Sequence, residues 1–169
     1  TDLKKYLVHD KTFLYVDVGG GSTELTIYSK GKLVLSKSFK IGTVRLINEL
    51  VPDSIWNQMK LWIKEHTKKY NQITLLGTGG NINSTYKFSG TKLGKPLSYH
   101  YLKKYFRTVE SFSYEERISK LNMNLDRADV ILPALNIYIS AMKWSGAKEI
   151  YVPKIGLSDG IIRSLYQNK

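Results

Sequence analysis

The sequence has 169 residues, a length typical of one domain, and its 26 lysine and arginine residues against 14 aspartate and glutamate residues give a net charge of +12. Its 42% hydrophobic and 12% aromatic content argues against a disordered chain, and the lack of cysteine excludes a disulfide scaffold, a thiolate zinc site and a cysteine nucleophile. The longest nearly apolar run, residues 130–142, is too short to span a bilayer, which takes about 20 residues. We therefore expect one cytoplasmic domain over residues 1–169, without a membrane partner.

The first part of the chain predicts three consecutive strands. Residues 13–18 are typical of a buried strand, residues 25–28 alternate apolar and polar side chains, and residues 33–41 form a third strand after a tight turn at residues 30–32. Strands joined by such short connections pair as an antiparallel meander.

Helices and strands alternate in the remainder, which predicts a mixed α/β domain with helices packed on a sheet. Thr43 is expected to cap a short helix, and Ser113 with Glu116 forms a capping-box signature. Asp126 is expected to cap a long helix that Pro133 bends near its start. The predicted helices are 43–50, 55–70, 81–88, 98–109, one from 113 to about 121, 127–144 and 156–166; the predicted strands are 73–76 and 149–152, and 89–97 is a loop.

The most informative motif joins the first two strands and runs Asp17-Val18-Gly19-Gly20-Gly21-Ser22-Thr23-Glu24. Its three glycines permit a tight turn and bring backbone N–H groups close to an anion, and the two hydroxyl side chains add donors. The carboxylates at both ends flank the mouth of the loop, an arrangement that suits Mg²⁺ because this ion takes few protein oxygens and shares substrate phosphates. A carboxylate there can also orient or deprotonate water. A glycine-rich hairpin with solvated acids is the alternative interpretation.

A second motif, Gly77-Thr78-Gly79-Gly80-Asn81, follows a strand and opens a helix. The N-terminus of a helix is a natural anion site, although this motif alone also describes an ordinary strand-to-helix turn. Two glycine loops, each at the end of a strand, can face one cleft and grip a phosphorylated ligand from both sides.

Together these residues resemble the exopolyphosphatase/guanosine pentaphosphate phosphatase family, within the superfamily of actin, sugar kinases and Hsp70-type ATPases. The resemblance rests on residues 17–24 followed by Gly42-Thr43-Val44-Arg45-Leu46, and continues through residues 77–80, 116–117 with 126–131, and 156–162. It implies a ribonuclease H-like, actin-like ATPase lobe of the α/β class, with helices on a mixed sheet that contains the three-strand meander.

The resemblance also implies roles for individual residues. Asp17 and Glu24 match residues that hold or approach the metal, and Glu24 is also placed to influence the attacking water, which makes it the catalytic candidate. Arg45 either contacts a phosphate or forms a surface salt bridge, and Asp159 is expected to cap the last helix. The candidate phosphate-binding residues are Gly19, Gly20, Gly21, Ser22, Thr23, Arg45, Gly77, Thr78, Gly79 and Gly80.

Family members have two similar lobes with the active site between them, and this sequence resembles the second lobe only. Because the first residue is not methionine, we expect a piece of a larger protein, without a further C-terminal helical domain. The implied activity is hydrolysis of terminal phosphoanhydride bonds in inorganic polyphosphate or guanosine pentaphosphate by Mg²⁺-assisted water. The first lobe holds a glutamate regarded as a main catalytic base, so we expect the isolated chain to be inactive.

The charge and the wider superfamily each leave one other function open. Residues 25–48 contain five basic residues and residues 66–109 contain eight, without an acid in either stretch. This pattern describes a solvated basic surface, or a field that attracts a polyanion beside the glycine loops. One alternative is therefore a non-catalytic polyphosphate-binding module. The resemblance to the wider superfamily implies another, the ATP-binding lobe of an actin-like kinase or ATPase. Nucleic acid is not an expected partner, whereas the missing first lobe and a second copy of the chain are.

Overall fold

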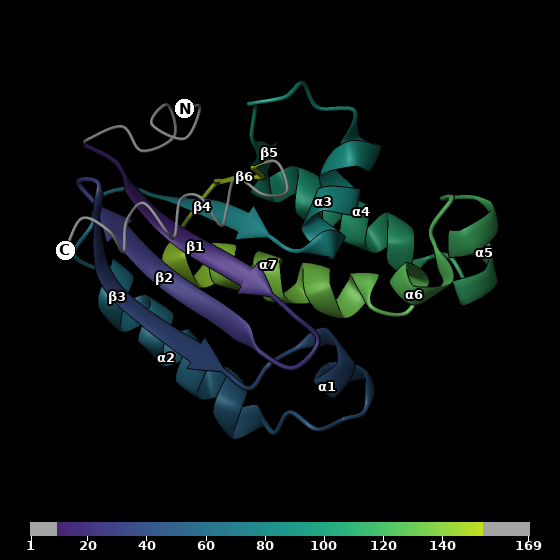
Figure 1. Ribbon diagram of the computed structural model, residues 1–169, viewed down its shortest axis with the longest axis horizontal. Helices are drawn as coiled ribbons and strands as arrows, with labels where there is room; N and C mark the ends of the chain where they lie inside the picture. Colours follow the sequence, from purple (N-terminus) through teal and green to yellow (C-terminus); the bar gives the residue numbers. More distant parts are fainter. Residues whose placement is uncertain (1–9, 154–169) are drawn as a thin grey trace.

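The computed structural model describes residues 10–153 (Figure 1). The predicted closing helix at 156–166, together with Asp159, lies outside these residues. None of the described helices has the length and the apolar character that crossing a membrane requires.

A six-stranded mixed sheet forms the centre of the domain, with the strand order β3-β2-β1-β4-β6-β5. β1 pairs antiparallel with β2, and β2 antiparallel with β3, which confirms the predicted meander and the mixed α/β class. β4 pairs parallel with both β1 and β6, whereas β5 pairs antiparallel with β6. The strands are β1 Thr12–Val18, β2 Thr23–Ser29, β3 Lys32–Phe39, β4 Ile73–Thr78, β5 Leu97–Ser98 and β6 Glu149–Tyr151.

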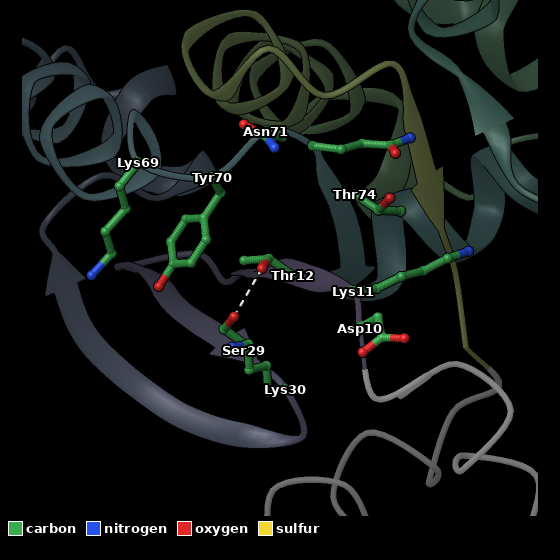
Figure 2. Close-up of a pocket in the computed structure, with 10 residues that line it drawn as sticks. Asp10, Lys11, Thr12, Ser29, Lys30, Lys69, Tyr70, Asn71 and Thr74 are labelled. Atoms are coloured by element: carbon green, nitrogen blue, oxygen red, sulfur yellow. Dashed lines mark hydrogen bonds between the residues drawn. The ribbon is translucent and has the colours of Figure 1, made fainter.

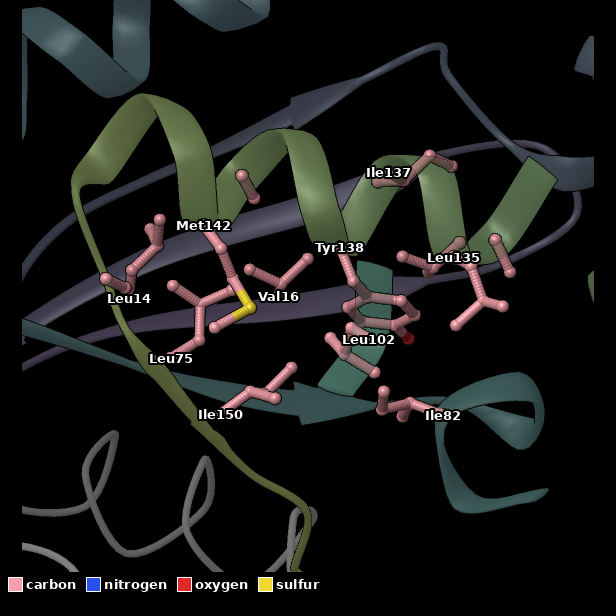
Figure 3. Close-up of a cluster of buried hydrophobic side chains, with 14 of the residues drawn as sticks. Leu14, Val16, Leu75, Ile82, Leu102, Leu135, Ile137, Tyr138, Met142 and Ile150 are labelled. Carbon is pink, nitrogen blue, oxygen red and sulfur yellow. The ribbon is translucent and has the colours of Figure 1, made fainter. Parts of the chain in front are cut away.

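Helices cover one face of this sheet and bury the main core against it (Figure 1). Alternation along β1 places Leu14 and Val16 in that core, whereas Phe13 and Tyr15 belong to a second buried cluster with Tyr28. The central helix, α7, packs over β1 and β4, as Figure 3 shows. The helices are α1 Thr43–Ile47, α2 Asp53–Thr67, α3 Gly80–Ser89, α4 Tyr99–Glu110, α5 Tyr114–Ser119, α6 Leu125–Ala128 and α7 Ile131–Ser145.

Local signals in the sequence explain several of these boundaries. Lys30 and Gly31, with φ of 51° and 73°, form the two-residue turn between β2 and β3, and this left-handed pair matches the twist of a hairpin. The predicted capping box at Ser113 and Glu116 is present at the start of α5. β5 was not predicted, because two residues carry no periodic pattern, and Leu97 is buried there opposite Ile150.

The predicted long helix at 127–144 is wrong, because the structure contains two helices instead, α6 and α7. Val130 stands between them with φ −101° and ψ −7°, and Asn124 rather than Asp126 precedes the first turn of α6. In a continuous helix the ring of Pro133 would clash with the carbonyl group of residue 129. Starting a new helix at Ile131 places Pro133 in a first turn, where an N–H group has no helical partner.

The burial of Tyr105 predicts a loss of stability in alkali. Burial, and next the nearby Tyr101, raise the pKa of Tyr105 to about 12, whereas an unfolded tyrosine titrates near pH about 10. The unfolded chain therefore releases a proton that the folded chain retains, so the free energy of unfolding falls between these pH values. Urea denaturation should show a shallower fall in Tyr105→Phe than in the parent chain. Equal falls would contradict this expectation.

Candidate functional site

The first glycine loop, residues 19–22, connects β1 to β2 and is held by the start of α1. The N–H of Gly19 donates to the carbonyl oxygen of Ser22 (3.0 Å), which closes the loop on itself. The N–H groups of Thr43 and Val44 then donate to the carbonyl oxygens of Gly19 and Gly20, each over 3.0 Å. The loop carbonyls are therefore turned toward α1.

Arg45 braces the same loop from α1. Its Nε donates to the carbonyl oxygen of Gly21 over 2.7 Å. Within residues 10–153 the Arg45 guanidinium forms no salt bridge. The described residues therefore do not contain the surface salt bridge that was one of the two roles expected for Arg45. The Arg45 guanidinium is thus positioned at the loop for which the sequence predicts phosphate binding.

Four polar residues lie in register across the end of the sheet where this loop begins. Asp17 is paired with Glu24 on β2 and with Thr78 on β4. Glu24 is paired in turn with Ser38 on β3. Because residues in register present their side chains on the same face, these four form a polar row, with Asp17 and Glu24 half-buried. One oxygen of Glu24, Oε1, accepts hydrogen bonds from Ser22 Oγ (3.0 Å) and Ser38 Oγ (2.6 Å).

The carboxylates of the polar row fit a magnesium ion. Side chains opposite each other on antiparallel strands have Cβ atoms about 5 Å apart, so Asp17 and Glu24 can share one ion. Residues 10–153 contain no cluster of three or more histidine, cysteine, aspartate or glutamate side chains at metal-binding distance. Two carboxylates from the protein nevertheless suffice for Mg²⁺, whose other ligands are usually water and substrate phosphate.

The second glycine loop, residues 77–80, runs from β4 into α3. Gly79 precedes the helix with φ 121°, a conformation that side chains rarely adopt, and a Cβ there would lie 2.9 Å from the carbonyl oxygen of Val18. Gly77 is buried within β4, where a Cβ would lie 2.6 Å from the side chain of Ile150. Because β1 and β4 are parallel neighbours, the two glycine loops leave the same end of the sheet.

Three hydroxyl groups of the predicted phosphate site are bonded to other protein groups in the structure. Ser22 donates to Glu24, the buried Thr23 donates to the carbonyl oxygen of Ile41 (2.6 Å), and the buried Thr78 donates to the Tyr15 hydroxyl (2.9 Å). The N–H groups of Gly20 and Gly21, by contrast, make no hydrogen bond within residues 10–153. The backbone of the first loop is therefore its main source of donors for an anion.

Two further residues reach the second loop and were not singled out from the sequence. The Arg127 guanidinium lies against Gly80, with its nitrogens 2.5 and 2.9 Å from the position that a Cβ would occupy. Tyr138 is fully buried on α7, and its hydroxyl donates to the carbonyl oxygen of Thr78. Arg127 belongs to a motif of the resemblance, but Tyr138 lies in an apolar run typical of core, so only the fold places either residue here.

A pocket of about 490 Å³ lies at the other end of the sheet, near the start of β1 and the end of β2 (Figure 2). Lys11 and Lys69 are among its lining residues, but Figure 2 shows their side chains pointing away from each other. The Lys69 ammonium lies 5.2 Å from the centre of the Tyr70 ring. These charges do not converge on one ligand, so the glycine loops remain the candidate site.

Residues 3–169 of the sequence match the sequence model of a known family, the Ppx/GppA phosphatase family. The chain belongs to the Ppx/GppA phosphatase family. A search of curated proteins found no match.

Solved structures of the Ppx/GppA family share the fold of this chain. A family member from Aquifex aeolicus is 24% identical, with a TM-score of 0.68, and the match covers 95% of this chain and 58% of that one. An exopolyphosphatase from Cytophaga hutchinsonii is 20% identical, with a TM-score of 0.74, and the match covers 94% and 58%. The likeness confirms the actin-like α/β fold. The chain spans a little over half the length of these relatives.

The contact between α1 and the first loop requires a glycine at position 42. A Cβ at Gly42 would overlap the backbone of Gly20, and would lie 2.6 Å from the carbonyl carbon of Gly21. We expect Gly42→Ala to lower the free energy of unfolding by about 1–3 kcal/mol, as overpacking does. Gly21→Ala is the matched control, because its Cβ meets nothing within 4 Å. Urea denaturation of both variants tests this, and equal stabilities would argue against the contact.

Proposed function

We propose that this chain is the second lobe of a phosphohydrolase that removes terminal phosphate from inorganic polyphosphate or guanosine pentaphosphate. The observation that carries the proposal is that two glycine loops leave the same end of the sheet, beside the half-buried pair Asp17 and Glu24. Membership of a phosphatase family and a fold shared with an exopolyphosphatase support it. Because the chain covers only 58% of these relatives, we assign the remaining part of the active site to a first lobe.

In this proposal the substrate phosphates bind the backbone N–H groups of Gly20 and Gly21 and the first turn of α3. Arg45 and Arg127 add positive charge on either side, and guanidinium groups form strong paired hydrogen bonds with phosphate. The net charge of +12 raises the local concentration of such a polyanion. The substrate is thus held from both loops at once.

Glu24 is the proposed catalytic residue. Because Ser22 and Ser38 both donate to its Oε1, the carboxylate is held in one orientation, and Oε2 remains to accept a proton from an attacking water. Asp17 and Glu24 would hold Mg²⁺. When bound, this ion would neutralise charge on the transferred phosphoryl group.

The proposed partners are the first lobe and, in its absence, a second copy of this chain. Val44, Ile47 and Leu50 are 52%, 46% and 59% exposed on and just after α1, beside the first glycine loop. An apolar surface at this position suits a contact with the opposite lobe. We also propose a cytoplasmic location, in keeping with a sequence that contains no cysteine.

Substitution of the two carboxylates in the two-lobed protein tests the catalytic assignment. We expect Glu24→Gln and Asp17→Asn each to lower kcat for phosphate release from polyphosphate by about 100-fold or more, because proton transfer and metal binding are both affected. Glu115→Gln, which neutralises an exposed carboxylate on α5, is the control and should retain full activity. Full activity of Glu24→Gln would rule out its catalytic role.

The second candidate function is a polyanion-binding module without catalysis, which the acid-free basic stretches favour. In that case polyphosphate binding falls steeply with salt and survives Asp17→Asn and Glu24→Gln, and the two-lobed protein releases no phosphate. Under the hydrolase proposal, the isolated 169-residue chain releases phosphate far more slowly than the two-lobed protein does. Phosphate release measured on both proteins, with and without Mg²⁺, separates these functions. Tight ATP binding by the two-lobed protein would instead favour a kinase or ATPase.

A further inference from the structure

Tyr138 places a hydroxyl group beside the ends of β1 and β4, from which the two glycine loops leave the sheet. It lies on α7 within the main core and is fully buried, and Figure 3 shows its side chain among apolar neighbours such as Leu102 and Leu135. Its hydroxyl donates to the carbonyl oxygen of Thr78, the last residue of β4. The hydrogen bond from Tyr138 therefore reaches the second glycine loop at Thr78, where β4 ends.

The same hydroxyl is also close to the end of β1. Burial raises the pKa of Tyr138 well above its ordinary value, the charge of Asp17 raises it further, and a backbone hydrogen bond with Val18 opposes the rise. A Cβ on Gly79 would lie 3.0 Å from the Tyr138 hydroxyl oxygen and 2.9 Å from the carbonyl oxygen of Val18. The hydroxyl thus occupies a space that only a glycine at position 79 leaves open.

The ladder between β1 and β4 ends where the two loops turn away from the sheet. The last pair of the ladder is Asp17 with Thr78. Beyond this pair, β1 continues into the first glycine loop and β4 continues through the second. Each loop is braced separately, the first by α1 and the second by the hydrogen bond from the N–H of Asn83 to the carbonyl oxygen of Gly79 (3.2 Å). The Tyr138 hydroxyl lies between the two strand ends and connects them.

We propose that Tyr138 is a positioning residue that holds the two glycine loops at a fixed separation, so that one polyphosphorylated substrate binds both. The substrate in this statement rests on the proposed function, whereas the connection between the loops does not. The physical reason is that a buried hydroxyl left without its partner is costly, so each strand end keeps its place relative to the hydroxyl.

Amide hydrogen exchange on the 169-residue chain tests the connection. Tyr138→Phe keeps the ring in the core and removes only the hydroxyl, and Tyr105→Phe is the matched control at a buried tyrosine on α4. The amides of Gly19 and Asn83 each donate to a carbonyl oxygen of one loop, that of Ser22 and that of Gly79. We expect both amides to exchange at least tenfold faster in Tyr138→Phe and at an unchanged rate in the control. Unchanged exchange at both amides, or equal acceleration along the whole chain, would overturn the proposal.

A second variant approaches the same contact from the loop. Gly79→Ala places a methyl group against the Tyr138 hydroxyl and the Val18 carbonyl, so the same two amides should exchange faster. It keeps the proposal testable if Tyr138→Phe folds poorly. Acceleration confined to Asn83, with Gly19 unchanged, would show that the hydroxyl does not connect the loops.

Kinetics of the two-lobed protein with inorganic tripolyphosphate test the consequence for substrate binding. We expect Tyr138→Phe to raise KM about tenfold and to change kcat less, because the hydroxyl positions binding groups and touches no reacting atom. Tyr105→Phe should leave both constants unchanged. If the two-lobed protein is active and Tyr138→Phe leaves its KM unchanged, the inference about Tyr138 is wrong and the proposed function stands. A two-lobed protein without hydrolysis overturns the proposed function, and amide exchange then decides the role of Tyr138.

Discussion

The parallel pairing of β1 with β4 is the interaction on which the candidate site depends. It brings the ends of two strands together, although Asp17 and Thr78 are far apart in the sequence. Both strands then continue into glycine loops at the same edge of the sheet. The antiparallel pairing of β1 with β2 adds Glu24 to that edge, and β3 adds Ser38. Sheet register therefore brings the carboxylates and the starts of both loops to one edge of the sheet.

Both loops also depend on glycines that leave room for a closely packed neighbouring group. Gly42 admits the backbone of Gly20, Gly79 admits that of Val18, and Gly80 admits the guanidinium of Arg127. In each case a side chain would displace the neighbouring group. The loops are therefore packed against α1, β1 and α6 rather than projecting freely into solvent, and this packing restricts the positions of their N–H groups.

Much of the fold followed from local patterns. Alternation along β1 and β2, the Lys30-Gly31 turn and the capping box at Ser113 each act over a few residues, so the sequence contains all the information they need. The break between α6 and α7 was not predicted, because the sequence suggested one long helix with a bend at Pro133. The ring of Pro133 instead acts on a carbonyl group one turn earlier. The two residues of β5 depend on pairing with β6, a partner about fifty residues away.

For the site, the sequence by itself determined the residue types: two carboxylates, two glycine loops and Arg45, in an order typical of a phosphate-binding family. Only the tertiary structure decided which of their groups remain for a ligand. The hydroxyls of Ser22, Thr23 and Thr78 are bonded to other protein groups. Arg127, from a motif whose role the sequence left open, and Tyr138, from an apolar run typical of core, both reach the second loop. The reason is that a hydrogen-bond partner across the chain is set by strand register and helix packing, which no local pattern records.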